Sequence, residues 1–321
     1  MSVIKSARLI KLYCFGGKMN AKVYYRHSGK APAVGVLGMF VAGVVAAVAG
    51  AFLYIHLIEL IPLIYFNFLI MLAYGALIGG AVALACKMGK VRNGPACTLI
   101  GLIAACVALY VEWSYFLAVK LPEVQGESLG TLELFRHFLT NPGDSWDIMN
   151  AFNAVGLWTI KKSVVKGVFL WVVWALEAVG IVAAAVLISR FYADEPYSET
   201  DNRWMDEEKF DARLAAVADP KAFTATLERG DYAPLFGLGV SDDAERFSRV
   251  KLYTSPGDAD AWMTLTDVTM VQKKKKKDPE EKTEQVCKLL HIPAQKAKEL
   301  AALLRSAVPA QEAGDAAKDA A

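Results

Sequence analysis

The sequence predicts an α-helical membrane protein with four transmembrane helices, followed by a C-terminal cytoplasmic α+β domain. Of the 321 residues, 55% are hydrophobic, and the mean hydropathy of +0.32 is higher than soluble domains usually reach. The long apolar runs fall within residues 1–190, which carry 16 Lys and Arg against 8 Asp and Glu. Residues 191–321 carry 19 Lys and Arg against 25 Asp and Glu. The chain therefore joins a basic membrane part to an acidic soluble part.

Four apolar runs are long enough to cross a bilayer, whose hydrocarbon core of about 30 Å needs roughly 20 helical residues. They cover residues 34–58, 61–86, 97–119 and 167–189, within a predicted transmembrane domain of residues 34–190. The first two runs are separated only by "HLIELIP". Because His56, Glu59 and Pro62 interrupt the apolar pattern there, we expect a tight hairpin at the level of the lipid headgroups.

The positive charges predict the orientation of these spans. Residues 1–33 form a basic segment with seven Lys and Arg and no acidic residue, and no signal-peptide cleavage pattern follows it. The link after the second span carries Lys87, Lys90 and Arg92. Three lysines just before the fourth span favour the opposite orientation, but the seven Lys and Arg of the N-terminal segment outnumber them. We therefore expect a multi-pass protein of the cytoplasmic (inner) membrane, with the N-terminus and C-terminus in the cytoplasm.

The outer connection, residues 120–166, is too long for a turn and too polar to cross the membrane. Its first part places Leu132, Phe135, Phe138 and Leu139 on one face of a helix over residues 131–139. A second short helix is expected to begin with Ser145 as its N-cap. Two amphipathic helices rich in aromatic residues predict an interfacial helical loop on the membrane surface.

The second of these helices has a regular polar face, formed by Asp144, Asp147, Asn150 and Asn153. Such oxygen groups can bind a cation such as Ca²⁺. The alternative is the solvated face of an interfacial helix, which we favour.

Two carboxyl groups lie inside predicted spans: Glu112 in "YVEWSYF" and Glu177 in "FLWVVWALEAVG". A charge at the middle of a bilayer costs roughly 2.5–3.5 kcal/mol on insertion scales, so such groups face protein or water. The two glutamates are expected at comparable depths. If their spans are neighbours, the carboxyl groups meet, and one of them then holds a proton.

Three interpretations of these glutamates remain open. In the first, each is a structural hydrogen-bonding group; in the second, both belong to a proton or cation path. In the third they line a pocket for a lipid headgroup or small amphiphile. The candidate hydrogen-bond partners are Tyr110, Ser114 and Asn67, and the candidate pocket walls are Trp113, Trp171 and Trp174. We favour the structural interpretation, because the spans show no repeats or interruptions typical of transporters. His56 and Glu59 are further intramembrane polar candidates.

Small residues recur every four positions in the first two spans, a spacing that lets helices approach closely in lipid. They are Ala42, Ala46 and Gly50 in the first span, and Gly75, Gly79 and Ala83 in the second. We expect these stripes to pack the helices of one chain together. Homo-oligomerisation through the same stripes is the alternative.

The predicted cytoplasmic domain covers residues 191–307, and a disordered tail follows over residues 308–321. Helices are expected over residues 206–219, 219–230, 281–290 and 293–308, and a β-hairpin is expected from residues 247–254 and 261–272. The helix over 219–230 has the clearest signals. Asp219 is its N-cap, Pro220 occupies its first position, and Gly230 ends it.

A basic cluster separates the hairpin from the last helices. It consists of Lys273, Lys274, Lys275, Lys276 and Lys277. A cytoplasmic cluster of this kind is attracted to anionic lipid headgroups. The alternative, which we favour, is a solvated loop whose charge is partly balanced by the acidic residues that follow.

The sequence contains no motif that indicates a catalytic, cofactor or metal site. The four histidines are scattered, and the five cysteines form neither a Cys-x-x-Cys pair nor a metal-ligand pattern. Phosphate-binding loops, nucleophile elbows and kinase motifs are absent. We therefore predict no cofactor and no metal, and an enzyme that acts on lipid at the interface is only the third interpretation, because no nucleophile or metal can be named for it.

These patterns lead to one functional expectation and one alternative. We expect a membrane-anchored interaction or sensing component that acts through its cytoplasmic domain. The alternative is a small transporter or channel that uses Glu112 and Glu177. The expected partners are membrane lipid, a protein bound by the cytoplasmic domain, and further copies of the chain. Nucleic acid is not expected, because the soluble part is acidic.

Overall fold

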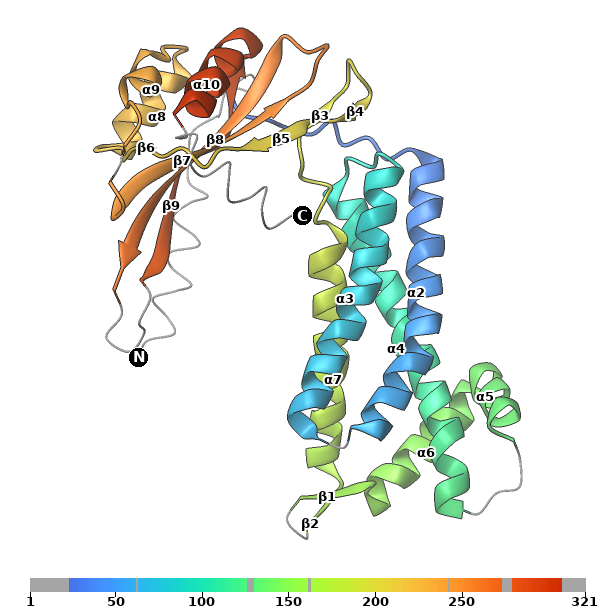
Figure 1. The fold of residues 1–321 in the computed structure, drawn as a ribbon. Helices are drawn as coiled ribbons and strands as arrows, with labels where there is room; N and C mark the ends of the chain where they lie inside the picture. The colour runs from blue at the N-terminus through green and yellow to red at the C-terminus, as the bar shows by residue number, and fades with distance from the viewer. Residues whose placement is uncertain are drawn as a thin grey trace, which may run out of the picture. The chain divides into compact units, whose positions relative to one another are not determined.

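The computed structural model describes residues 23–61, 63–125, 130–160, 163–241, 243–272 and 279–307. Within these residues the chain forms two compact units (Figure 1). The first consists of residues 27–195. The second combines residues 23–26 with the described residues from Pro196 onward. The first unit thus extends a few residues past the predicted boundary at residue 190, and Arg190 pairs with Asp194 at 2.9 Å there.

Four helices of the first unit are long and apolar enough to cross a membrane. They are α2 (Ala33–Leu60), α3 (Ile64–Met88), α4 (Gly94–Gln125) and α7 (Val168–Ser189), and they correspond to the four predicted spans. Their outward faces are apolar too: Leu53, Phe66 and Leu176 are each more than half exposed. Helices that are apolar all round are typical of a lipid environment, so the first unit has the features of a multi-pass membrane protein.

The four spanning helices form a closed bundle. Helix α2 packs against α3 and α4, and α7 packs against the same two helices on their other side (Figure 1). The core of the unit lies along the centre of this bundle, where one residue of each helix illustrates the packing: Ile55, Ile78, Leu117 and Ile181 are at most 1% exposed.

Two short helices at one end of the bundle follow α4, namely α5 (Thr131–Thr140) and α6 (Pro142–Val155). Helix α5 confirms the prediction for residues 131–139, and Phe135, Phe138 and Leu139 of the predicted apolar face turn inward, with Leu134 in place of Leu132. Leu134 and Phe138 are buried, whereas Leu132 is 79% exposed. Phe135 lies with its ring centroid 5.3 Å from that of Phe52 in α2. The helix therefore packs its aromatic face onto the bundle.

The prediction that Ser145 caps the next helix is wrong. Helix α6 begins at Pro142, directly after Asn141. Ser145 is buried within its first turns and donates a hydrogen bond to the Phe138 carbonyl at 3.1 Å. A short hairpin that the sequence analysis did not predict follows α6, formed by β1 (Trp158–Ile160) and β2 (Ser163–Val165).

The second unit contains an antiparallel sheet and three helices. Its strands are β3 (Tyr197–Ser198), β4 (Arg203–Trp204), β5 (Asp206–Lys209), β6 (Leu214–Ala215), β7 (Arg246–Thr254), β8 (Asp260–Val271) and β9 (Glu280–Pro293), and its helices are α8 (Pro220–Glu228), α9 (Ala233–Gly237) and α10 (Ala294–Ser306). The sheet order is β5-β7-β8-β9, with β6 also paired to β7, and β3 and β4 form a separate hairpin. Residues 23–25 lie beside β9, where Tyr24 bridges Leu290.

One face of this sheet carries the core of the unit. Leu252 and Met263 of the central strands pack with Ile292 of β9 and with Leu300 and Leu304 of α10, and all five are fully buried. An antiparallel sheet with helices on one face leaves its other face available to solvent or to a partner.

Three sequence predictions for this unit are confirmed. The hairpin over residues 247–254 and 261–272 corresponds to β7 and β8, and the last helix corresponds to α10. Helix α8 begins as predicted, because the Asp219 carboxylate accepts hydrogen bonds from the Lys221 and Ala222 amides. Gly230 follows its end with a φ of 85°, a left-handed conformation that glycine adopts without strain.

The predicted helix over residues 206–219 is wrong, because this segment forms β5 and β6. Between β5 and the start of β6, the buried residues Phe210, Ala212 and Leu214 alternate with charged residues, so this stretch runs extended with one buried face. A period of two is typical of a strand with one buried face. The abundance of acidic residues and alanine suggested a helix, but pairing with β7 determines the structure.

The predicted helix over residues 281–290 is also wrong, since this segment lies in β9. Residues such as Glu284, Gln285 and Lys288 favour helices weakly, but they pair here as a strand with β8. The register shifts between Met263 and Leu265, so the ladder contains a bulge. Tertiary pairing thus overrides local propensity.

Several predictions fall outside the described residues. They are the basic segment up to residue 22, the lysines Lys273, Lys274, Lys275, Lys276 and Lys277, and the tail over residues 308–321.

Candidate functional site

The candidate site is a group of four polar side chains inside the bundle, one from each spanning helix. Glu112 of α4 is 3% exposed, and Glu177 of α7 is partly exposed. The two carboxyl groups lie within hydrogen-bonding reach of each other. The spans that carry them are therefore neighbours, and the two glutamates meet.

Two tyrosines complete this group. The Tyr54 hydroxyl of α2 donates a hydrogen bond to Oε1 of Glu177. The Tyr54 ring stacks on that of Tyr74 in α3, with a centroid distance of 5.2 Å and an interplanar angle of 15°. The Tyr74 hydroxyl donates to the Ala47 carbonyl of α2 at 2.8 Å. We call these four residues, Tyr54, Tyr74, Glu112 and Glu177, the carboxyl cluster.

The carboxyl cluster lies well inside the spanning segments. Glu112 precedes the end of its span at Pro122 by ten residues, and Glu177 follows the start of α7 by nine. At 1.5 Å per helical residue, both are about 14 Å from the same end of the bundle. At this depth a carboxyl group is costly and is a candidate for function by default.

The hydrogen-bonding needs of the cluster are not completely met. Within the part of the chain that the structure describes, Oε2 of Glu112 is buried and has no hydrogen-bond partner. A buried acceptor without a partner costs about 1–3 kcal/mol. Such an atom in a native structure calls for an explanation, such as a bound water, an ion or a role in proton chemistry.

The three residues predicted as hydrogen-bond partners of the glutamates make other contacts. The Ser114 hydroxyl donates to the Tyr110 carbonyl of its own helix at 2.8 Å. The Tyr110 hydroxyl donates to the Leu139 carbonyl at 2.9 Å. Oδ1 of Asn67 is buried without a partner among the described residues. None of the three bonds to a glutamate of the cluster.

Tyr54 and Tyr74 were not among the residues predicted from the sequence. A signal was present, because tyrosines of membrane proteins concentrate at the lipid-water interfaces. Tyr54 lies six residues before the end of α2, and Tyr74 lies ten residues after the start of α3. A tyrosine so far inside a span indicates a buried partner for its hydroxyl group.

The three tryptophans proposed as pocket walls pack against one another. The centroids of Trp113 and Trp174 are 4.9 Å apart, and those of Trp171 and Trp174 are 5.1 Å apart. Both pairs meet edge to face, which is a favourable arrangement for aromatic rings. They join α4 to α7 at the level of the cluster.

His56 and Glu59 do not join the carboxyl cluster. His56 is hydrogen-bonded through Nε2 to the Tyr115 hydroxyl at 2.8 Å. Glu59 pairs with Lys120 at 2.7 Å between Oε1 and Nζ. Both contacts connect the last turns of α2 to α4, near the end of the bundle.

The small residues explain how the helices approach closely enough to form the cluster. A Cβ atom added at Gly75 would lie 2.5 Å from the Ile181 carbonyl oxygen, and one at Gly79 would lie 2.6 Å from that of Ala185. These two glycines therefore let α3 rest on the backbone of α7. Ala83, one turn further along α3, is 2% exposed.

In α2 the buried stripe differs by one position from the predicted one. Gly50 is buried, and a Cβ atom there would lie 2.6 Å from the Tyr74 ring. Ala46 is half-buried, whereas Gly43 and Ala47 are buried. Because Gly50 has no side chain, the Tyr74 ring fits against α2 at this position.

The polar residues of α6 serve separate contacts. Oδ2 of Asp144 lies 2.7 Å from Nε2 of His137. The Asn153 amide donates to the Gly167 carbonyl at 2.9 Å. The Asn150 amide donates to the Trp146 carbonyl within the same helix. These side chains therefore do not converge on one point, as cation ligands would.

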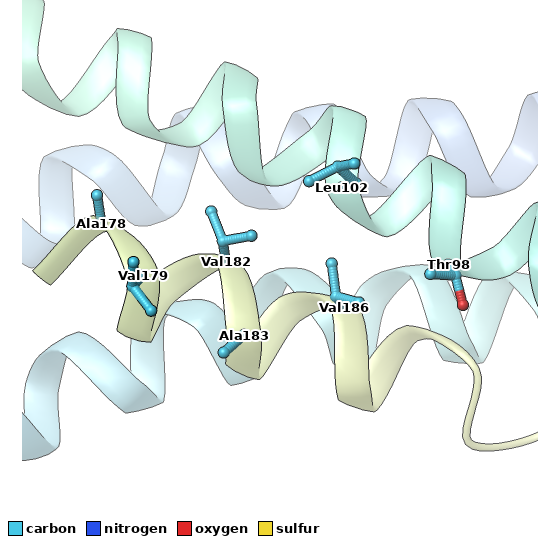
Figure 2. Close-up of a pocket in the computed structure, with 7 residues that line it drawn as sticks. All are labelled: Thr98, Leu102, Ala178, Val179, Val182, Ala183 and Val186. Atoms are coloured by element: carbon cyan, nitrogen blue, oxygen red, sulfur yellow. The ribbon is translucent and has the colours of Figure 1, made fainter. Parts of the chain in front are cut away.

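An apolar groove runs along the outside of the bundle between α4 and α7. Its volume is about 450 Å³, and it is lined by Thr98, Leu102, Ala178, Val179, Val182, Ala183 and Val186 (Figure 2). Figure 2 shows Leu102 of α4 and Val182 of α7 pointing toward the space between the two helices. A groove of this composition on a spanning bundle is suited to lipid chains.

Comparisons with known proteins supply no assignment. No family model matches the chain, no curated protein matches its sequence, and no solved structure matches its fold. The functional argument therefore rests on the geometry described above.

Proposed function

We propose that this chain is a membrane-anchored interaction or sensing component, in which the four-helix bundle fixes the location and the C-terminal α+β unit binds a protein partner. The observation that carries this proposal is that the second unit has a hydrophobic core of its own, made from residues of β6 to β9 and α8 to α10 and of the segments between them. A unit with its own core can serve as a binding module.

The face of the sheet opposite α10 is the proposed binding surface. The antiparallel register brings Arg249 opposite Thr266, Lys251 opposite Thr264, and Tyr253 opposite Trp262. All six side chains are partly exposed, while their neighbours along both strands are buried on the helix side. Tyrosine, tryptophan and arginine are the residue types enriched at protein interfaces.

The location forms part of the proposal. The even number of spans and the basic N-terminal segment support a cytoplasmic (inner) membrane protein with both termini in the cytoplasm. A reporter fused to the C-terminus that is active only outside the cytoplasm would contradict this orientation. Membrane lipid and further copies of the chain are proposed as additional partners.

A crosslinked co-purification from native membranes tests the proposed function. The full chain is compared with a chain truncated after Tyr192, which keeps all four spanning helices. Thr266→Arg places a large side chain on the proposed surface, and Ala302→Arg makes a similar change on the exposed side of α10. We expect capture of specific proteins by the full chain and by Ala302→Arg. Capture that persists after truncation or with Thr266→Arg would contradict the proposal.

A second candidate function is a small transporter or channel that uses Glu112 and Glu177. The carboxyl cluster favours it, because all four spanning helices contribute to one buried polar group. Reconstitution into liposomes tests this candidate by measuring proton or cation flux. Flux should be lost in Glu112→Gln and retained in Ser114→Ala, a substitution two residues away that removes only a hydrogen bond within α4.

A further inference from the structure

We propose that Glu112 and Glu177 form a proton-binding site inside the membrane bundle, with Tyr54 as the group that positions Glu177. This inference rests on the same cluster as the second candidate function. It goes further, because it names the ligand as a proton and requires no flux across the membrane.

The first argument is the chemistry of two carboxyl groups in contact. Two carboxylates have no hydrogen atom to share, so a hydrogen bond between them requires a proton on one of them. Glu112 and Glu177 lie within hydrogen-bonding reach, in an environment where two adjacent charges repel strongly. The pair therefore binds one proton, and the cluster then carries a single negative charge.

The second argument is the charge around the pair. Tyr54 faces it from α2 and Tyr74 from α3, and both hydroxyls have partners. Among the described residues, no Lys, Arg or His side chain pairs with either glutamate, and the nearby Lys120 is paired with Glu59. Since none of the cations among the described residues balances the remaining charge, a second proton can neutralise it. In that step a proton adds to the remaining carboxylate, and Tyr54 keeps its own.

The third argument is the unsatisfied atom. Glu112 is 3% exposed, and its Oε2 has no partner in the described part of the chain. A purely structural pair would be expected to satisfy both carboxyl groups completely. An acceptor without a donor, next to a second carboxyl group, is instead a place where an added proton forms a hydrogen bond.

Infrared spectroscopy of the full chain in lipid nanodiscs tests the proposal. The wild type at neutral pH should show the carbonyl stretching band of a protonated carboxylic acid, and the band should shift in D₂O. The band should disappear in the double variant Glu112→Gln/Glu177→Gln, which keeps the shape of both side chains, whereas each single variant leaves one carboxyl group that still holds a proton. The band should persist in Glu59→Gln, a matched change at a carboxylate paired with Lys120.

Three results would overturn the proposal. They are the absence of the band in the wild type, its persistence in the double Gln variant, and its loss when choline is replaced by Na⁺ at constant pH. The last result would identify a metal cation as the ligand.

If the Gln variants fail to fold, Tyr54→Phe keeps the ring and removes only the donor to Glu177. The band should then remain and change frequency, and an unchanged band would contradict the proposed role of Tyr54. The infrared test of proton binding can fail or succeed independently of the flux test of the second candidate function. Presence of the band without flux in liposomes supports proton binding and rejects transport.

Discussion

Replacement of Gly79 by alanine should weaken the packing of α3 on α7. A Cβ atom at this position would lie 2.6 Å from the Ala185 carbonyl oxygen, whereas ordinary contacts begin at 3.4 Å. The helices would therefore have to part by up to about 0.8 Å, the difference between these distances. Overpacking of this kind costs about 1–3 kcal/mol. Alanine also favours the helix over glycine by up to about 1 kcal/mol, so the net loss should be about 0–2 kcal/mol.

Gly80 provides the matched control. It neighbours Gly79 in the same helix, and a Cβ atom there would meet nothing within 4 Å. Gly80→Ala should therefore show only the gain in helix propensity, up to about 1 kcal/mol. The expected difference in the free energy of unfolding between the two variants is about 1–3 kcal/mol.

Reversible unfolding in mixed micelles with increasing SDS measures this difference. Tryptophan fluorescence is a suitable signal, because Trp113 and Trp174 lie in contact between α4 and α7. If Gly79→Ala is as stable as Gly80→Ala, or more stable, the close approach of α3 to α7 is not what Gly79 provides. The reasoning from Cβ contacts would then be refuted.

Three further predictions concern the C-terminal unit. The Arg249 guanidinium lowers the pKa of Glu281, so the pair stabilises the fold above the unfolded pKa of about 4.3 and loses this effect as the pH falls through the folded pKa. Urea unfolding of Glu281→Gln should show a loss of up to about 1 kcal/mol at neutral pH, which shrinks toward zero in acid; a loss that does not depend on pH would contradict the ion pair. Burial raises the pKa of the Cys287 thiol to about 11, and maleimide should therefore label it only after denaturation. Asp219→Ala should cost about 1 kcal/mol in urea unfolding, because it removes the N-cap of α8, whereas an unchanged midpoint would show that the cap contributes nothing.

The carboxyl cluster connects the two proposals for this protein. In a sensing component, a proton taken up between α4 and α7 changes the repulsion between these helices. The apolar groove between α4 and α7 lies on the same pair of helices, so a change in their spacing would alter the surface offered to lipid. In a transporter, the same protonation would be one step of a cycle. The infrared and flux measurements separate these cases.

Within the C-terminal unit, the sequence determined the elements that carry strong local signals. Asp219 and Pro220 mark the start of α8 by capping chemistry, and the alternating residues of β7 and β8 mark their hairpin. The segments that became β6 and β9 carry residues compatible with a helix. Only pairing with β7 and β8 made them strands, since a strand is stabilised by partners that are distant in sequence.

In the membrane part, the sequence alone determined the four spans, because a run of about 20 apolar residues has the length and composition to cross a bilayer. It also showed that Glu112 and Glu177 lie inside them. The tertiary structure decided which side chains meet, namely Tyr54 with Glu177 and Tyr74 with the backbone of α2. It also decided that Gly43 and Ala47 are buried where Ala46 is not. The physical reason is that a helix in lipid is apolar on every side, so its sequence has no polar face to show which side turns inward.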